Sequence, residues 1–254
     1  MTQGAFTNFP QRRPFAYWRY GTLSLHFDFL ATQSEMLCDA PDELVIPYTQ
    51  TMMGFLLFKP RPARIVVIGL GGGSLPKYCY AKISEASVLA VEIDPHVIAL
   101  RNLFRVPPDD ERFRVLCADG AAFVRNAVNC VDVLLVDGFD ANGQSAQLCT
   151  QAFYDDCFRS LTPGGILVVN FTVEDPNAGQ SVARIRRRFG SAVVVTSQDC
   201  ANRVVFAGTG PELGLPHEQL CARLGALERI HPVGLRETLQ HIRYEQYCLS
   251  AAVS

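Results

Sequence analysis

Short apolar segments alternate with helix-like segments from residue 65 to residue 171, and this alternation limits the possible folds more than any other feature. The apolar segments cover residues 65–69, 88–93, 113–117, 131–136 and 166–171. They contain almost no polar positions, which is typical of strands buried on both faces of a parallel sheet. The sequence therefore predicts an α/β fold, with a mostly parallel sheet and helices on both of its faces.

The connecting segments have helical signals. We expect helices over residues 74–83, 95–104, 120–127, 152–160 and 180–189. Two later apolar runs, 192–196 and 203–207, are separated by a polar break and predict an antiparallel pair. Two helices are expected near the C-terminus, over residues 218–227 and 235–247.

The N-terminal part differs from the rest. Residues 20–29 and 29–36 predict a short β-hairpin, and a helix is expected to start near Asp42 despite Pro47. Pro60 and Pro62 mark a linker. We therefore expect two regions, a small N-terminal hairpin and helix region over residues 1–60 and a larger cofactor-binding domain over residues 61–254.

Composition narrows the class of protein. Hydrophobic residues make up 48% of the 254 residues and the net charge is −2, which favours a folded domain and gives no sign of a nucleic-acid partner. No apolar run approaches the roughly 18 residues of a membrane span, so neither a membrane segment nor a signal peptide is expected. The nine cysteines form no CxxC pair, which predicts buried free thiols in the cytoplasm and no metal site; the alternative is a disulfide scaffold or a zinc site.

A glycine-rich loop follows the first strand of the predicted sheet. Gly69, Gly71, Gly72 and Gly73 precede a helix, and glycines in this position let the backbone approach a ligand. Glu92 stands at the end of the next strand, where a carboxylate accepts hydrogen bonds from a ribose diol. A glycine loop with such an acid indicates a nucleoside-binding site, for either a dinucleotide or an S-adenosyl compound.

A second acid favours the S-adenosyl compound. Asp119 and Gly120 follow the third strand, where a carboxylate suits the amino group of adenine. Ser74 occupies the position where a dinucleotide loop prefers glycine or alanine. The alternative is that Glu92 and Asp119 merely cap the following helices.

Two further acids follow the fourth strand. Asp137 and Asp140 lie in a polar loop, beyond the strand end where ligands of open α/β sheets bind. An alkyl ammonium has a pKa near 10.4 and cannot attack until it loses a proton, which a carboxylate pair can accept. A sulfonium compound supplies the electrophilic carbon. The alternative is a turn stabilised by the aspartate side chains.

Over residues 21–206 the chain resembles the spermidine synthase (aminopropyltransferase) family. The matching motifs are VIGLGGGS, VEIDPHVI, ADG, DGFD and QAFYDDCFRSLTPGGILVVN. The resemblance implies a Rossmann-like, methyltransferase-type sheet behind a small N-terminal β-region, and a homodimer. It implies that Gln33 and Tyr48 line the pocket for cofactor and polyamine substrate, that Asp137 is the general base, and that Asp140 assists in binding the amine.

The family activity is aminopropyl transfer from decarboxylated S-adenosylmethionine to an amine such as putrescine, with release of methylthioadenosine. This chain departs from the family pattern at one position that affects the choice of donor. The family has an acidic residue in the glycine loop where this chain has Gly72, and that acid would hold the ammonium of the decarboxylated donor. The sequence therefore leaves two alternatives for the cofactor, decarboxylated and intact S-adenosylmethionine. Two alternatives follow: a methyltransferase, or a non-catalytic protein that binds nucleosides or polyamines.

Overall fold

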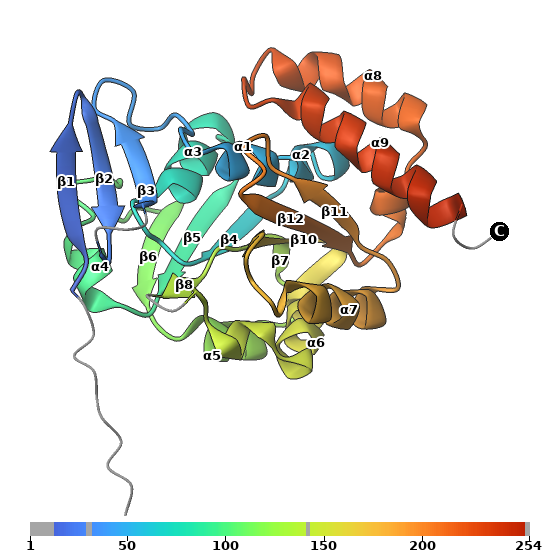
Figure 1. Ribbon diagram of the computed structural model, residues 1–254, viewed down its shortest axis with the longest axis horizontal. Helices are drawn as coiled ribbons and strands as arrows, with labels where there is room; N and C mark the ends of the chain where they lie inside the picture. The colour runs from blue at the N-terminus through green and yellow to red at the C-terminus, as the bar shows by residue number, and fades with distance from the viewer. Residues whose placement is uncertain (1–12, 29–31, 141–142, 252–254) are drawn as a thin grey trace, which may run out of the picture.

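A central seven-stranded sheet organises the chain in the computed structural model, which describes residues 13–28, 32–140 and 143–251 (Figure 1). The strand order is β11-β12-β10-β7-β4-β5-β6. The five parallel strands are β4 (Arg64–Ile68), β5 (Ser87–Glu92), β6 (Phe113–Cys117), β7 (Val131–Val136) and β10 (Leu161–Thr172). β12 (Asn202–Gly208) runs antiparallel to both β10 and β11 (Val193–Thr196), which confirms the predicted late pair.

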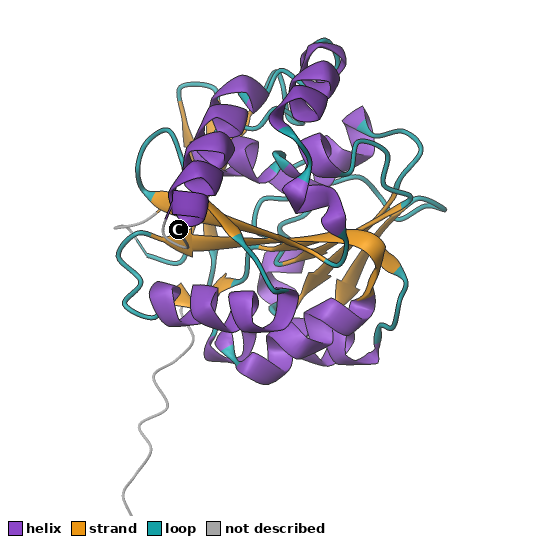
Figure 2. Cartoon of the chain, turned by 90° about the vertical axis from the view of Figure 1, so that its right-hand side faces the viewer, coloured by secondary structure: helices purple, strands orange, loops and turns teal. Residues whose placement is uncertain are grey.

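Helices cover both faces of the sheet, as predicted, and Figure 2 shows the sheet between the two helical layers. One layer holds α5 (Gly120–Asn126), α6 (Gln151–Ser160) and α7 (Ala178–Phe189). The other holds α1 (Pro47–Met52), α2 (Phe55–Phe58), α3 (Ser74–Lys82), α4 (Pro95–Ala99), α8 (His217–Glu228) and α9 (Leu235–Ala251). This arrangement follows from right-handed crossovers between parallel strands.

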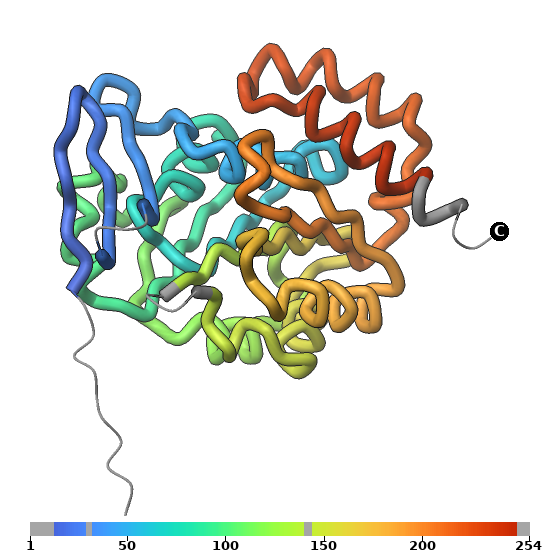
Figure 3. Tube along the Cα trace, viewed as in Figure 1, coloured from blue at the N-terminus to red at the C-terminus, as the bar shows by residue number. Residues whose placement is uncertain are grey.

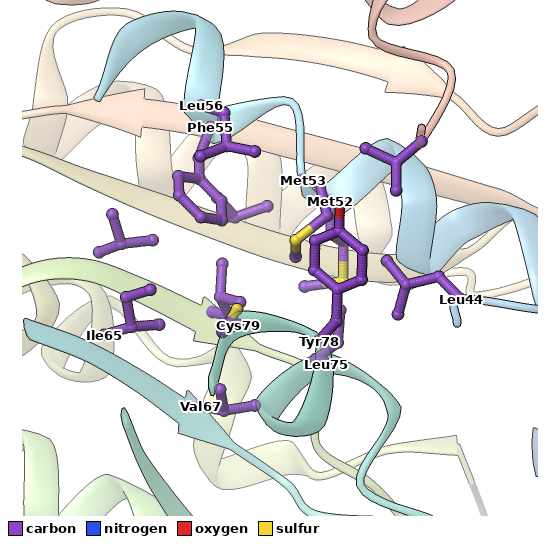
Figure 4. Packing of buried hydrophobic residues seen from close by; sticks show 14 of the residues in the cluster. Leu44, Met52, Met53, Phe55, Leu56, Ile65, Val67, Leu75, Tyr78 and Cys79 are labelled. Carbon is purple, nitrogen blue, oxygen red and sulfur yellow. The ribbon is translucent and has the colours of Figure 1, made fainter. Parts of the chain in front are cut away.

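The apolar side chains of residues 44–58 pack into the core on the α3 side of the sheet. Figure 4 shows side chains from this segment, from α3 and from β4 in one cluster; they include Leu44, Met52, Met53, Phe55, Leu56, Ile65, Val67, Leu75, Tyr78 and Cys79. All of them are buried. The segment thus joins the N-terminal sheet to the central one, and the division at residue 60 stays a prediction.

The N-terminal region is a three-stranded antiparallel sheet rather than a hairpin. It consists of β1 (Phe15–Arg19), β2 (Thr22–His26) and β3 (Thr32–Leu37), and the trace in Figure 3 places it beside the first turn of α3. The predicted pair corresponds to β2 and β3, whereas β1 was missed. The prediction of a strand from residue 20 was wrong at its start, because Tyr20 and Gly21 have φ of 46° and 79° and form the turn between β1 and β2.

Two helix bounds differ from the prediction. The helix expected from Asp42 begins at Pro47, because proline lacks the N–H that an interior helical position needs and fits the first turn. The helix expected over residues 95–104 ends at Ala99. The loop after β7 contains a small hairpin that was not predicted, formed by β8 (Phe139–Asp140) and β9 (Gly143–Gln144), and then the short helix η1 (Ala146–Cys149).

The eight cysteines whose side chains the structure describes are free thiols, but their predicted burial holds only in part. Cys79 and Cys157 are buried, whereas Cys117, Cys200 and Cys221 are exposed. Burial raises the pKa of the Cys79 thiol to about 12, so it stays protonated. Among the described helices, none has the length and apolar character needed to cross a membrane.

Candidate active site

The predicted site residues gather at one edge of the sheet, where the four neighbouring strands β7, β4, β5 and β6 end. The glycine loop follows β4 and Glu92 is the last residue of β5. Asp119 follows β6 and Asp137 follows β7. The carboxyl ends of parallel strands are the usual ligand-binding edge of such a sheet, so the arrangement agrees with a nucleoside site.

Gly69 brings the tip of β7 against the glycine loop. Its φ is +97°, and a Cβ atom at this position would lie 2.2 Å from the carbonyl oxygen of Asp137. The N–H of Asp137 donates to the carbonyl oxygen of Ile68 at 2.9 Å. Gly69 therefore permits the close approach of two backbone segments. The sequence had instead suggested that this glycine lets the backbone approach a ligand.

Glu92 holds the glycine loop onto β5. Its side chain is 8% exposed. One carboxylate oxygen accepts the N–H of Leu70 at 2.8 Å, and the other accepts the N–H of Asp94 at 2.9 Å. Glu92 does not cap the next helix, because Asp94 does so by accepting the N–H of His96 at 2.8 Å. Each oxygen of Glu92 retains a lone pair for a hydroxyl donor.

Asp119 does cap a helix, as the alternative interpretation held. Its Oδ1 accepts the N–H groups of Ala121 and Ala122 at 2.7 and 3.1 Å, at the start of α5. Its Oδ2 has no hydrogen-bond partner among the described residues and is available to an amino group. Gly120 packs on β4, where a Cβ atom would lie 2.4 Å from Cγ2 of Ile68.

The carboxylate of Asp137 is held at both oxygens. Tyr48 donates its hydroxyl to Oδ2 at 3.0 Å, and Asn170 donates Nδ2 to Oδ1 at 2.8 Å. Asn202 in turn donates Nδ2 to Oδ1 of Asn170 at 3.0 Å. Asn170 is 1% exposed, whereas Asp137 and Tyr48 are half-buried. The chain of side chains fixes the direction in which Asp137 presents its carboxylate.

The electrostatics of this group favour proton acceptance. Burial raises the pKa of Asp137, and the hydrogen bonds from Asn170 and Tyr48 act in the opposite direction. Burial and the neighbouring Asp137 charge raise the pKa of Tyr48 well above its usual value. Tyr48 therefore stays protonated and donates, while Asp137 is a stronger base than a solvated carboxylate.

The other predicted residues are less directly connected. Gln33 lies half-buried in β3, beside Ser34, whose hydroxyl lies 3.2 Å from that of Ser74 at the start of α3. A Cβ atom on Gly72 would lie 2.7 Å from Oγ of Ser34. The backbone of Asp140 pairs with Gly143 in the β8–β9 hairpin, but its side chain lies outside the described part of the chain.

Asn170 and Asn202 were missed by sequence analysis. Asn170 is the polar residue near the end of the apolar run 166–171, and Val169 pairs with Val136 in the parallel register. That register places Asn170 next to Asp137. A polar residue at the end of the fifth parallel strand was therefore the available signal, whereas the contact with Asn202 depends on the antiparallel pairing of β10 and β12.

The residues present fit an adenosine. Glu92 and Asp119 offer acceptor oxygens at adjacent strand tips, suited to the hydroxyls of a ribose and the amino group of an adenine. In the part of the chain that the structure describes, no three His, Cys, Asp or Glu residues gather as metal ligands would.

This chain is similar to known proteins in both sequence and fold. Residues 46–198 match the family model described as the spermine/spermidine synthase domain. The polyamine aminopropyltransferase of Chromobacterium violaceum is 38% identical over 172 residues, which are 67% of this chain and 66% of that protein. The resemblance seen in the sequence is thereby confirmed.

Two solved structures support the fold. Human methyltransferase-like protein 13 in complex with SAH has a TM-score of 0.66 and 24% identity, over 77% of this chain and 93% of that one. A probable spermidine synthase from Corynebacterium glutamicum has a TM-score of 0.66 and 17% identity, over 77% and 76% of the two chains. The methyltransferase-like sheet predicted from the sequence is confirmed.

Proposed function

Because the chain belongs to the spermine/spermidine synthase family, we propose that it is an aminopropyltransferase that uses decarboxylated S-adenosylmethionine and an amine such as putrescine. The amine nitrogen attacks the carbon beside the sulfonium. A C–N bond forms and the C–S bond breaks, and the electron pair leaves with sulfur as methylthioadenosine. The proton lost by the amine goes to Asp137.

One observation carries this proposal: the half-buried carboxylate of Asp137, oriented by Tyr48 and Asn170 at the strand edge beside the glycine loop. Each oxygen uses one lone pair for these contacts and keeps another for the ammonium of the substrate. A carboxylate with a raised pKa attracts the cation and then accepts its proton. We assign Asp140 to amine binding as a second acid on the same loop.

Glu92 and Asp119 would bind the adenosine part of the donor, through the ribose hydroxyls and the adenine amino group. Gly71, Gly72 and Gly73 would lie along the donor, and Gln33 and Tyr48 would cover it from the N-terminal side. Ser34 supports this placement, because it belongs to the same strand as Gln33 and lies against Gly72 and Ser74.

The variant Tyr48→Phe is expected to move the acid limb of the pH–rate profile to higher pH. Asp137 must be ionised to accept a proton, so the rate falls as the pH drops through its pKa. The Tyr48 hydrogen bond lowers that pKa, and its removal therefore raises it. The measurement is kcat/KM against pH, with Tyr20→Phe as a control because Tyr20 is 93% exposed. A limb that stays in place would contradict the assigned contact.

Gly72 predicts weak discrimination between the two donors. The loop offers no carboxylate at this position to hold the ammonium of the decarboxylated donor or to repel the carboxylate of the intact one. We expect their dissociation constants, measured by calorimetry, to differ by less than about tenfold, which is about 1.4 kcal/mol. A preference of more than about a hundredfold for the decarboxylated donor would show that another residue replaces the missing acid.

Methyl transfer from intact S-adenosylmethionine is the second candidate function, and Gly72 is the observation in its favour. The nucleoside product distinguishes the two reactions, because aminopropyl transfer releases methylthioadenosine and methyl transfer releases S-adenosylhomocysteine. The homodimer and the cytoplasmic location stay predictions, and sedimentation of the full chain tests the first.

A further inference from the structure

A cavity of about 550 Å³ lies at the opposite end of the strands from the candidate active site. It opens on the α5 side of the sheet, at the first residues of β4, β5 and β6. The floor of the cavity is one face of the sheet. Val66 on β4 pairs with Leu89 on β5, and Leu89 pairs with Arg114 on β6, so the three side chains lie side by side on that face. Arg64 lies two residues before Val66 and therefore points to the same face.

The cavity exists because α5 is too short to cover the strands beneath it. Its seven residues span about 10 Å, whereas the six residues of β5 span about 20 Å. The helix starts at the carboxyl ends of the strands, where Gly120 packs on Ile68, and it stops part of the way along them. Leu89 is consequently only half-buried, although β5 is an interior strand of the sheet. Phe123 and Ala127 form the wall above it.

The charged groups around the cavity are mostly cationic. Three arginines and one glutamate, Glu111, line it. Arg112 is engaged, because its guanidinium donates to the carbonyl oxygen of Ala86 at 3.1 Å and lies 4.4 Å from the ring centre of Tyr80. The exposed side chains of Arg64 and Arg114 have neither a hydrogen bond nor an ion pair within the described residues.

We propose that this cavity binds a small amphipathic anion, one with a flat apolar body and a carboxylate, sulfonate or phosphate group. Its volume falls in the range of about 300–1,000 Å³ that is typical of small-molecule sites. Leu89 and Phe123 contact the apolar body. Arg64 and Arg114 pair with the anionic group, for which guanidinium has a matching geometry. A concave site suits a small ligand better than the flat face of a protein.

The fluorescent probe 8-anilinonaphthalene-1-sulfonate has this chemistry, and a titration of the full chain with it tests the proposal. We expect saturable binding, and we expect Arg114→Gln and Arg64→Gln each to weaken it at least about fivefold, as for the loss of a charge-assisted contact. Arg187→Gln is the matched control, because Arg187 is an exposed arginine on α7, away from the cavity. Its binding should equal that of the wild type.

The variant Ala127→Phe fills the cavity and should remove the arginine-dependent binding. Thermal unfolding of each variant verifies that it is folded, and the arginine variants, at exposed positions, keep the test decisive if Ala127→Phe is unstable. Equal probe binding by the wild type and Arg114→Gln would overturn the proposal. A change of sedimentation coefficient in Arg114→Gln, without loss of probe binding, would assign this face to contacts between copies of the chain and would overturn the proposal as well.

Discussion

The variant Asp137→Asn is expected to lose about 10²–10⁴-fold in kcat while it binds methylthioadenosine as the wild type does. An amide has nearly the shape of the carboxylate and can still accept one of the two hydrogen bonds from Tyr48 and Asn170. It cannot accept the proton of the amine. The loss should therefore appear in the chemical step rather than in nucleoside affinity, which calorimetry measures separately.

Asp155→Asn provides the matched control. Asp155 lies on α6, its side chain is 46% exposed, and the same substitution there should leave kcat unchanged. An Asp137→Asn enzyme that retains more than roughly a tenth of the wild-type rate would exclude Asp137 as the general base. Asn170→Ala gives an independent check, because it removes a hydrogen bond that lowers the pKa of Asp137 and should move the acid limb upward, as Tyr48→Phe does.

The second large effect is expected on stability, from Gly69→Ala. The added methyl group would lie 2.2 Å from the carbonyl oxygen of Asp137, at a φ of +97° that alanine rarely adopts. Neither backbone can move away easily, because β4 and β7 are paired in the middle of the sheet. We expect the free energy of unfolding to fall by more than about 3 kcal/mol.

Gly190→Ala separates the steric clash from the backbone strain. Gly190 has a φ of +82°, and a Cβ atom there would have nothing within 4 Å. Its φ of 82° and ψ of −36° are strained for alanine, so the substitution should cost the backbone strain alone, about 1–3 kcal/mol. Urea unfolding of both variants gives the comparison. If the two variants lose similar amounts of stability, a Cβ atom at position 69 does not clash with the carbonyl group of Asp137, and the close approach of β4 and β7 at Gly69 is contradicted.

Sequence patterns predicted the central sheet because its strands are uninterrupted apolar segments. The ends of these segments also located Glu92, Asp119 and Asp137, since each acid lies at a strand end or within two residues after it. The strand β1 was missed for the opposite reason. Its Tyr17 and Trp18 are 54% and 53% exposed, so burial imposes little pattern on its sequence.

The side-chain contacts of the site depend on tertiary structure and could not be predicted in the same way. Tyr48 and Asp137 are 89 residues apart in sequence, and only the packing of α1 over the sheet brings them together. The contact between Asn170 and Asn202 likewise requires the antiparallel register of β10 and β12. The role of Gly69 required the position of a neighbouring carbonyl group, which no local sequence pattern contains.

Product analysis tests the central claim most directly. The wild-type chain is incubated with putrescine and either donor, and the nucleoside and amine products are separated and quantified. Aminopropyl transfer predicts methylthioadenosine and an aminopropylated amine in equal amounts from the decarboxylated donor, and both products formed about 10²–10⁴-fold more slowly by Asp137→Asn. S-adenosylhomocysteine formed from the intact donor, with no methylthioadenosine from the decarboxylated one, would contradict the account.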